Sequence, residues 1–238
     1  MELFIASTPQ APPPPGTYTS VWAACCTGDR LQVCEDLPRG GYLMVLYGKE
    51  SRDSALLARD ILRLCLADEH PGILLDLPPG SEHCGQIVKD LAALCPKYGI
   101  SLAVPESYAA MGGDLVILPS APVGGNLQTH LQKAAASYGA GRILLDLERT
   151  CRDYLLPCPA GPGHCMDQET FRRLSCGCTY YFSPELCARY FTYRCGTQSH
   201  YVVYDDADTL RRKMAHGEEL GITKGVMVYG EVKDLWPL

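Results

Sequence analysis

The stretch that decides the fold is Tyr201 to Leu238, which reads YVVYDDADTLRRKMAHGEELGITKGVMVYGEVKDLWPL. It opens with a short strand candidate, Tyr201 to Tyr204, made of β-branched and aromatic residues. Helical periodicity follows from Asp208 to Leu220, and Gly221 ends it, as glycine commonly does after the last turn of a helix. The apolar run Gly225 to Tyr229 is then predicted as a buried strand. The stretch therefore predicts a helix between two strands.

The same alternation runs upstream and is typical of repeated βα units. Apolar residues at helical spacing predict three further helices, at Ser51 to Ala67, Ser81 to Tyr98 and Leu127 to Tyr138. Apolar runs predict seven further strands, at Leu3 to Ala6, Thr19 to Cys25, Tyr42 to Tyr47, Gly72 to Leu77, Ile100 to Val104, Asp114 to Leu118 and Arg142 to Leu147. Together with Gly225 to Tyr229 they would make eight strands, the number in a (β/α)₈ barrel, and 238 residues suit one.

Two segments depart from this alternation of strands and helices. Pro9 to Gly16 contains four consecutive prolines, so a rigid loop is expected where a barrel helix would stand. Residues 150–200 are rich in cysteine and tyrosine and are predicted to be an insertion with short strands, such as Thr179 to Phe182. The predicted fold is therefore a reduced α/β (β/α)₈ TIM-type barrel, a single domain over residues 1–238, with this insertion between the seventh and eighth strands.

The insertion holds more than half of the 13 cysteines, and their arrangement allows two interpretations. One is a structural zinc site drawn from Cys158, Cys165, Cys176 and Cys178, although no CxxC pair occurs. The other, which we favour, is a scatter of small free thiols in a reducing compartment, with no metal and no cofactor. The aromatic residues of the insertion are expected to form its own small core, while some could stack on sugar rings.

Charge and hydropathy narrow the range of partners. The net charge is −6 and the pI is near 5.5, which argues against a nucleic-acid backbone or an anionic membrane as the main partner. No apolar run approaches the roughly 18 residues of a spanning helix. The N-terminus has no basic region and only a short apolar run, so a signal peptide is not predicted and a cytoplasmic location is expected.

The closing stretch resembles the end of the family 18 glycoside hydrolases, which include chitinases and N-acetylglucosaminidases of the bacterial spore cortex. The resemblance lies in Tyr204-Asp205-Asp206, then Lys213, then Leu220-Gly221, then Gly225 to Tyr229, which read in the order that family members show. Weaker similarities upstream cover Thr19 to Leu31 and Gly99 to Pro105. The resemblance implies a barrel with a small α+β insertion before the eighth strand, and a cytoplasmic or spore-associated protein.

The family hydrolyses glycosidic bonds with help from the N-acetyl group of its substrate, using a DGxDxDxE pattern on the fourth strand. The matching stretch is Pro71 to Pro78, in which Asp76 falls on the last aspartate. Pro71 and Leu74 replace the other two aspartates, and Pro78 replaces the glutamic acid that would protonate the leaving oxygen. A general acid contributes a factor of about 10² to 10⁴, so the family mechanism is predicted to be impaired or lost.

Two further strands depart from the family pattern. The sixth strand, which usually supplies a tyrosine and an aspartate near the acetamido group, ends in Leu118-Pro119-Ser120. The eighth strand ends in Tyr229, where the family usually has a tryptophan beneath the sugar. Tyr229 keeps an aromatic face, and substrate-binding roles are predicted for four residues: Tyr47, Asp146, Tyr229 and Glu231.

Other carboxylates could replace the missing acid, because catalytic residues of these barrels sit at the C-terminal ends of strands. The candidate catalytic residues are Asp76, Glu106 and Glu148. Three hypotheses remain open: a catalytically impaired protein that binds N-acetylglucosamine-containing glycan, an active glycoside hydrolase with relocated carboxylates, and a structural or interaction protein. The chain runs only about eight residues past the eighth strand, which predicts a side without a final helix that a second copy of the chain could cover.

Overall fold

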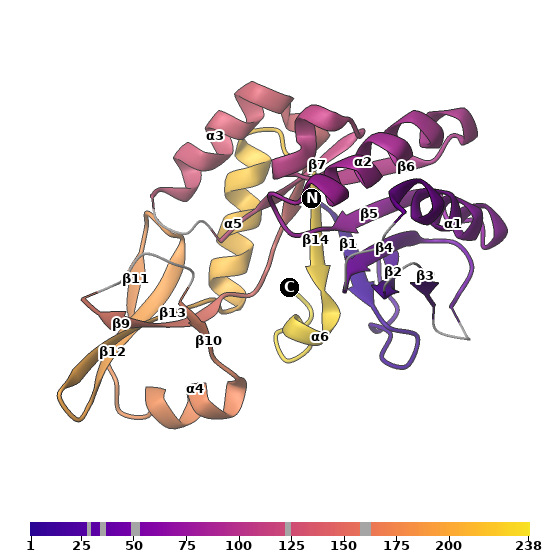
Figure 1. Cartoon of the computed structure of the whole chain (residues 1–238). Coiled ribbons are helices and arrows are strands. Elements are labelled where there is room, and N and C mark those ends of the chain that lie inside the picture. Colours follow the sequence, from indigo (N-terminus) through magenta and orange to yellow (C-terminus); the bar gives the residue numbers. More distant parts are fainter. Residues whose placement is uncertain (28–29, 34–36, 49–52, 122–124, 158–162) are drawn as a thin grey trace.

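Eight parallel strands close into a barrel in the computed structural model, which describes residues 1–27, 30–33, 37–48, 53–121, 125–157 and 163–238 (Figure 1). Neighbouring strands follow the order β1-β14-β8-β7-β6-β5-β4-β2, and pairing of β1 with β2 closes the ring. Their bounds are β1 Glu2–Ser7, β2 Thr19–Thr27, β4 Tyr42–Tyr47, β5 Gly72–Asp76, β6 Ser101–Pro105, β7 Leu115–Pro119, β8 Ile143–Asp146 and β14 Lys224–Val228. The predicted TIM-type barrel is therefore confirmed.

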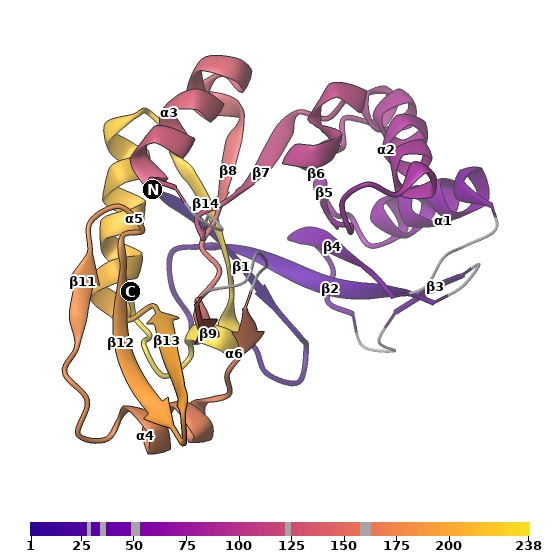
Figure 2. The ribbon, with the colours of Figure 1, turned by 60° about the vertical axis from the view of Figure 1, so that its left-hand side comes forward.

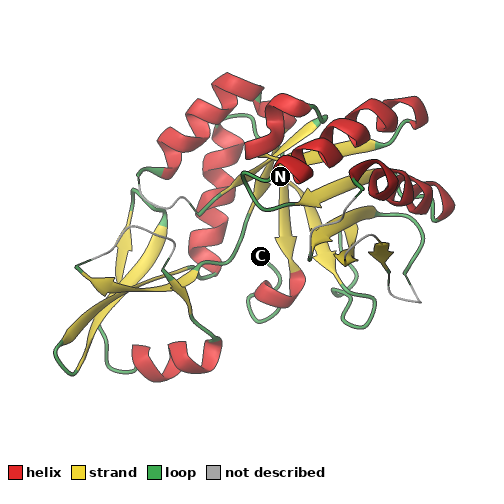
Figure 3. Ribbon diagram, in the orientation of Figure 1, coloured by secondary structure: helices red, strands yellow, loops and turns green. Residues whose placement is uncertain are grey.

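The helices cover only part of the barrel's outer face (Figures 1 and 3). The longer helices that flank the barrel are α1 Ser54–Ala67, α2 Glu82–Leu94, α3 Leu127–Tyr138 and α5 Ala207–Glu219, while α6 Tyr229–Val232 is a single turn. Short 3₁₀ turns occur at Cys95–Tyr98, Glu106–Met111 and Ala140–Arg142. The loop from residue 8 to residue 18 joins β1 directly to β2, and β3 Arg30–Gln32 pairs antiparallel with β2. Among the described residues, no helix is long and apolar enough to cross a membrane.

Residues along each barrel strand alternate between the interior and the helix-covered outside, as the two-residue period of a strand requires. The interior cluster contains Phe4, Ala6, Val21, Leu74, Ala103, Leu115, Leu144 and Val226. Tyr42 fills the same space, with its ring edge-on to Phe4 at 5.0 Å between centroids. Gly72 makes room for that ring, because a Cβ on Gly72 would lie 2.2 Å from Tyr42 Cε1. The barrel interior is thus a packed core, as is usual for barrels of this type.

A second, antiparallel sheet lies beside the barrel (Figure 2). In the chain it follows β8 and precedes α5. Its five strands, in spatial order, are β10 His164–Cys165, β9 Cys151–Leu156, β13 Gln198–Tyr204, β12 Ala188–Cys195 and β11 Tyr181–Ser183. The helix α4 Gln168–Ser175 packs on one face through Phe171, whose ring lies 4.8 Å from Tyr204 and 5.9 Å from Phe191. The insertion between the seventh and eighth barrel strands therefore has an aromatic core of its own.

Several predicted boundaries shift by a few residues. α3 matches its prediction over Leu127–Tyr138, whereas α1 starts at Ser54, and residues 51–52 of that prediction lie outside the described residues. α2 gives way to a 3₁₀ turn at Cys95, because Pro96 cannot continue the hydrogen-bonding pattern of a helix. The larger difference is in the insertion, where β9, β12 and α4 were not predicted.

A buried ion pair anchors α5 to the start of the insertion. Lys213 Nζ lies 2.7 Å from Asp205 Oδ2, and both side chains are withdrawn from solvent. Asp205 also accepts hydrogen bonds from the Thr150 backbone N–H at 3.0 Å and from Thr209 Oγ1 at 2.8 Å. Asp206 caps the helix, since its side chain accepts from the Thr209 N–H. This explains why a lysine can lie on the buried face of α5.

The side without a full final helix is covered by the chain's own C-terminal segment. Trp236 packs edge-on against Tyr18 and Tyr229, with ring centroids 6.1 Å and 5.9 Å away. Leu235 and Leu238 pack with these three rings in one apolar cluster on the outer side of the barrel, here called the outer cluster. The prediction of a second copy on this side is not supported, and the tail takes the place of part of the missing helix.

Candidate functional site

A cavity of about 500 Å³ opens at the barrel mouth, where the C-terminal ends of the strands meet. Carboxylates line it together with apolar and proline side chains. The lining includes Met44, Leu46, Leu75, Asp76, Leu77, Pro79, Pro105, Glu106, Ser107, Ile117, Pro119, Asp146, Glu148, Val226, Val228 and Glu231. Five of the seven predicted site residues therefore meet in one cavity, and these five are the acids Asp76, Glu106, Asp146, Glu148 and Glu231.

Strand geometry explains the positions of two of these acids. Asp76 is the last residue of β5 and shares the inward face of Leu74, two residues earlier. Asp146 is the last residue of β8 and shares the inward face of Leu144 in the same way. Both side chains consequently point into the mouth, which is where the active sites of such barrels lie.

The acids raise one another's pKa. Burial raises the pKa of Asp146 to about 7, and the negative charges of Glu148, Glu231 and Asp76 add to the effect, while Lys213 opposes it. Burial and then Glu148 raise the pKa of Asp76, although that side chain remains solvent-exposed. Burial and Glu148 likewise raise the pKa of Glu231. Asp146 is therefore poised to hold or release a proton near neutral pH.

Two of the acids have partners at the rim. Glu148 Oε1 accepts a hydrogen bond from Arg152 Nη2 on β9 at 3.1 Å, which links the insertion to the mouth. Glu106 faces Tyr138, whose pKa is raised by burial and by that carboxylate. Because of these contacts, fewer carboxylate oxygens of Glu148 and Glu106 are available to a ligand.

Arg149 fixes the C-terminal wall of the cavity. Its Nη1 donates to the backbone oxygen of Glu231 at 2.9 Å and to Asp234 Oδ1 at 2.5 Å. The Arg149 side chain is only 12% exposed, whereas its partner Asp234 is 43% exposed. Sequence reasoning assigned no role to Arg149 or Arg152. The available signal was their position within a few residues of the C-terminal end of β8, where the mouth begins.

The two residues that follow β5, Leu77 and Pro78, carry no acidic side chain. Pro78 follows β5, and its carbonyl accepts a 2.5 Å hydrogen bond from the Tyr108 hydroxyl. The same hydroxyl accepts from the Ser81 N–H at 3.1 Å, so the loop between β5 and α2 is pinned. On β7 the inward position at the strand end is Pro119, whose side chain has no polar group.

The two predicted aromatic contacts do not line this cavity. Tyr47 points to the outside of the barrel, on the same face of β4 as Leu43 and Val45. Its ring packs near His83, with ring centroids 6.4 Å apart. Tyr229 begins α6 and packs against Trp236 in the outer cluster. The structure therefore brings the predicted acids together without these two aromatic rings.

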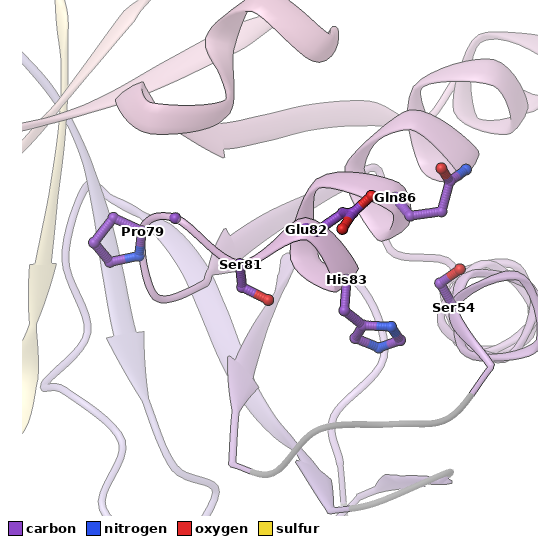
Figure 4. A pocket seen from close by; sticks show the side chains of 7 residues that line it. Ser54, Pro79, Ser81, Glu82, His83 and Gln86 are labelled. Carbon is purple, nitrogen blue, oxygen red and sulfur yellow. The ribbon is translucent and has the colours of Figure 1, made fainter.

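A second hollow of about 800 Å³ lies outside the barrel, where α1 and α2 begin (Figure 4). Its lining is Ser54, Pro79, Gly80, Ser81, Glu82, His83 and Gln86. Pro79 also lines the mouth cavity, so the loop after β5 separates the two spaces. Among the described residues of this lining, Glu82 is the single acid, so the concentration of carboxylates is at the mouth.

Metal-ligating side chains do not converge in the part of the chain that the structure describes. There, no group of three or more His, Cys, Asp or Glu side chains could hold a metal ion. Cys165, Cys176 and Cys178 of the alternative zinc site are free thiols, and Cys158 lies outside the described residues.

An eight-stranded parallel barrel with a small α+β insertion before its last strand, and an acid-lined mouth, defines the class to which this fold belongs. It is the fold of the family 18 glycoside hydrolases, which confirms the resemblance of the closing stretch at the level of the fold.

Three solved structures illustrate this likeness. A chitinase from Chromobacterium violaceum is 12% identical with a TM-score of 0.67, and the match covers 97% of this chain and 94% of that one. The Bacillus cereus spore cortex-lytic enzyme SleL is 14% identical with a TM-score of 0.66, over 97% of this chain and 71% of that one. Human YKL-39, described as a pseudo-chitinase with retained chitooligosaccharide binding, is 11% identical with a TM-score of 0.63, over 96% and 92%. No protein-family model and no curated protein matches the sequence.

Proposed function

We propose that this glycoside hydrolase-like barrel binds an N-acetylglucosamine-type glycan, chitin-like or peptidoglycan-like, at its mouth without hydrolysing it by the family mechanism. Two points support the proposal: carboxylates line the mouth cavity, and in the sequence Pro78 aligns with the glutamic acid that serves as proton donor in the family pattern. Asp76 and Asp146 supply acceptors for sugar hydroxyl and amide groups. Substrate-assisted hydrolysis needs an acid at the leaving oxygen, and Pro78 has no proton to give.

The rest of the lining suits a sugar ring. Leu46, Leu77 and Val228 offer apolar surface to the C–H faces of a pyranose, and the acids offer hydrogen-bond acceptors at the edge. A concave, mostly apolar site with a few convergent polar groups is typical of small-molecule binding. The pseudo-chitinase among the similar structures is an example of this fold that binds chitooligosaccharide.

Calorimetric titration with hexa-N-acetylchitohexaose tests binding, and chromatography of the same mixture after a long incubation tests turnover. We expect saturable binding that Asp76→Asn and Asp146→Asn weaken, with no shortened oligosaccharide. Asp60→Asn, on α1 away from the mouth, is the matched control and should bind like the wild type. Absence of binding to this oligosaccharide and to soluble peptidoglycan fragments would favour a structural or interaction role, such as one in a spore, and would overturn the proposal.

A second candidate function is glycoside hydrolysis with relocated carboxylates. It is favoured by the pKa of Asp146, which burial and neighbouring acids raise to about 7, the range that suits a general acid. In that case Asp146 would donate the proton and Asp76 or Glu148 would act as base or nucleophile. Turnover with a bell-shaped pH profile that Asp146→Asn abolishes would establish this function in place of binding alone.

A further inference from the structure

Two carboxylates of the mouth cavity lack partners. Neither Asp76 nor Asp146 accepts a hydrogen bond through its side chain from any residue that the structure describes. Glu148, by contrast, is paired with Arg152 at 3.1 Å, and Glu106 faces the Tyr138 hydroxyl. Asp76 and Asp146 therefore both have side-chain oxygens that no described residue donates to.

These two acids approach the cavity from opposite walls. β5 and β8 are separated in the barrel by β6 and β7, and both strands end in an inward-pointing aspartate. Both carboxylates line the same cavity of about 500 Å³. No lysine or arginine is among the described residues that line the cavity. Lys213, whose positive charge lowers the pKa of Asp146, forms an ion pair with Asp205 at 2.7 Å.

This arrangement selects among ligands by charge and by the number of donors. A metal ion is poorly matched, because no three potential ligands converge among the described residues. A neutral acetamido group carries one N–H and no charge, so the group itself can donate to only one of the two aspartates. A primary ammonium group carries three donors and a positive charge, and it can bridge two carboxylates.

We infer that the mouth cavity holds an amino sugar whose 2-amino group is free and protonated, bridged between Asp76 and Asp146. The ligand would then be a partly de-N-acetylated glycan, with a glucosamine-type unit at the mouth. This inference rests on the proposed function and specifies which unit of the glycan occupies the cavity. Neighbouring units that lie outside the cavity can keep their acetyl groups.

The test compares glucosamine hexamer with N-acetylglucosamine hexamer by calorimetric titration at pH 6. We expect the glucosamine oligomer to bind at least about tenfold more tightly, a factor that corresponds to about 1.4 kcal/mol. Asp76→Asn and Asp146→Asn should each remove most of that preference, whereas Asp60→Asn should keep it. Raising the salt concentration should weaken binding of the glucosamine oligomer more than that of the acetylated one.

Hexalysine serves as a probe of unspecific attraction, because the protein carries a net charge of −6. Hexalysine binding as tight as that of the glucosamine hexamer would overturn the inference, as would equal binding of the two sugars or an unchanged preference in both aspartate variants. Binding of the acetylated hexamer without any preference would overturn the inference alone and leave the proposed function standing. Failure of both sugars to bind would overturn both. Thermal unfolding of each variant confirms that it is folded.

Discussion

The buried pair of Lys213 and Asp205 offers a quantitative test of how the closing helix is held. The Lys213→Met variant keeps most of the side-chain volume and removes the charge. Asp205, which is fully buried, then loses the 2.7 Å contact to Nζ and keeps its hydrogen bonds from Thr150 and Thr209. Stranding a buried charge costs about 3–5 kcal/mol, and the two surviving bonds place this case near the lower end.

The expected loss is large compared with typical protein stabilities of about 5–15 kcal/mol. Urea unfolding followed by circular dichroism measures it. With a denaturant slope of about 3 kcal/mol per molar urea, a loss of about 3 kcal/mol lowers the midpoint by about 1 M. Arg211→Met, an exposed position on the same helix, is the control and should change stability by less than about 0.5 kcal/mol.

The double variant Lys213→Met with Asp205→Asn separates charge from packing. The asparagine would carry no stranded charge and would still accept from the Thr150 N–H, so the double variant should regain more than half of the lost stability. A midpoint for Lys213→Met within about 0.3 M of the wild type would refute the reasoning, because it corresponds to less than about 1 kcal/mol. So would a double variant whose loss equals the sum of the two single losses.

Two further predictions concern the barrel interior and its mouth. Because the folded state raises the pKa of Asp146 from 3.8 to about 7, it binds this proton more tightly than the unfolded chain does, and ionisation of Asp146 costs stability as the pH rises through this range. Asp146→Asn removes that cost, so the stability of the variant relative to the wild type should grow between pH 5 and pH 8. The expected gain in thermal unfolding is on the order of 1–2 kcal/mol, after screening by water in the cavity. A constant difference across that range would count against the raised pKa. Gly72→Ala places a methyl group 2.2 Å from the Tyr42 ring and should cost about 1–3 kcal/mol in thermal unfolding, part of which Tyr42→Leu should restore. An alanine variant as stable as the wild type would contradict the packing described for the barrel interior.

The barrel was predictable because its strands are continuous apolar runs buried on both faces. Ile73, Leu74 and Leu75 show no alternation, yet the run between turn residues marks a central parallel strand. The meeting of Asp76 and Asp146 followed from the same prediction, since each acid ends a strand and all parallel strands end at one mouth. Topology thus predicted that the acids meet at the mouth, and the family pattern also pointed to Asp76.

The insertion was harder to predict because its strands are polar and pair over long sequence distances. β12 reads Ala-Arg-Tyr-Phe-Thr-Tyr-Arg-Cys, in which aromatic and charged residues mix on both faces. Its apolar face becomes evident only once α4 is seen to pack on it through Phe171 and Phe191. Tyr47 could have been assigned from the sequence, because it shares the phase of Leu43 and Val45 on the outward face of β4.

The position of β1 has a consequence for how the chain folds. β1 lies between β2 and β14, and its pairing with β14 joins residues from opposite ends of the chain, such as Glu2 with Lys224 and Ala6 with Val228. Bringing such distant segments together carries the greatest entropic cost of any contact in the barrel, and slow, non-local pairing of this kind limits folding rates. On a ribosome, β14 emerges after the other seven barrel strands, and until then β1 has an unpaired edge. For most of its synthesis the nascent barrel is therefore an open sheet with an unpaired edge that can associate with other chains. The ring closes only after β14 is released.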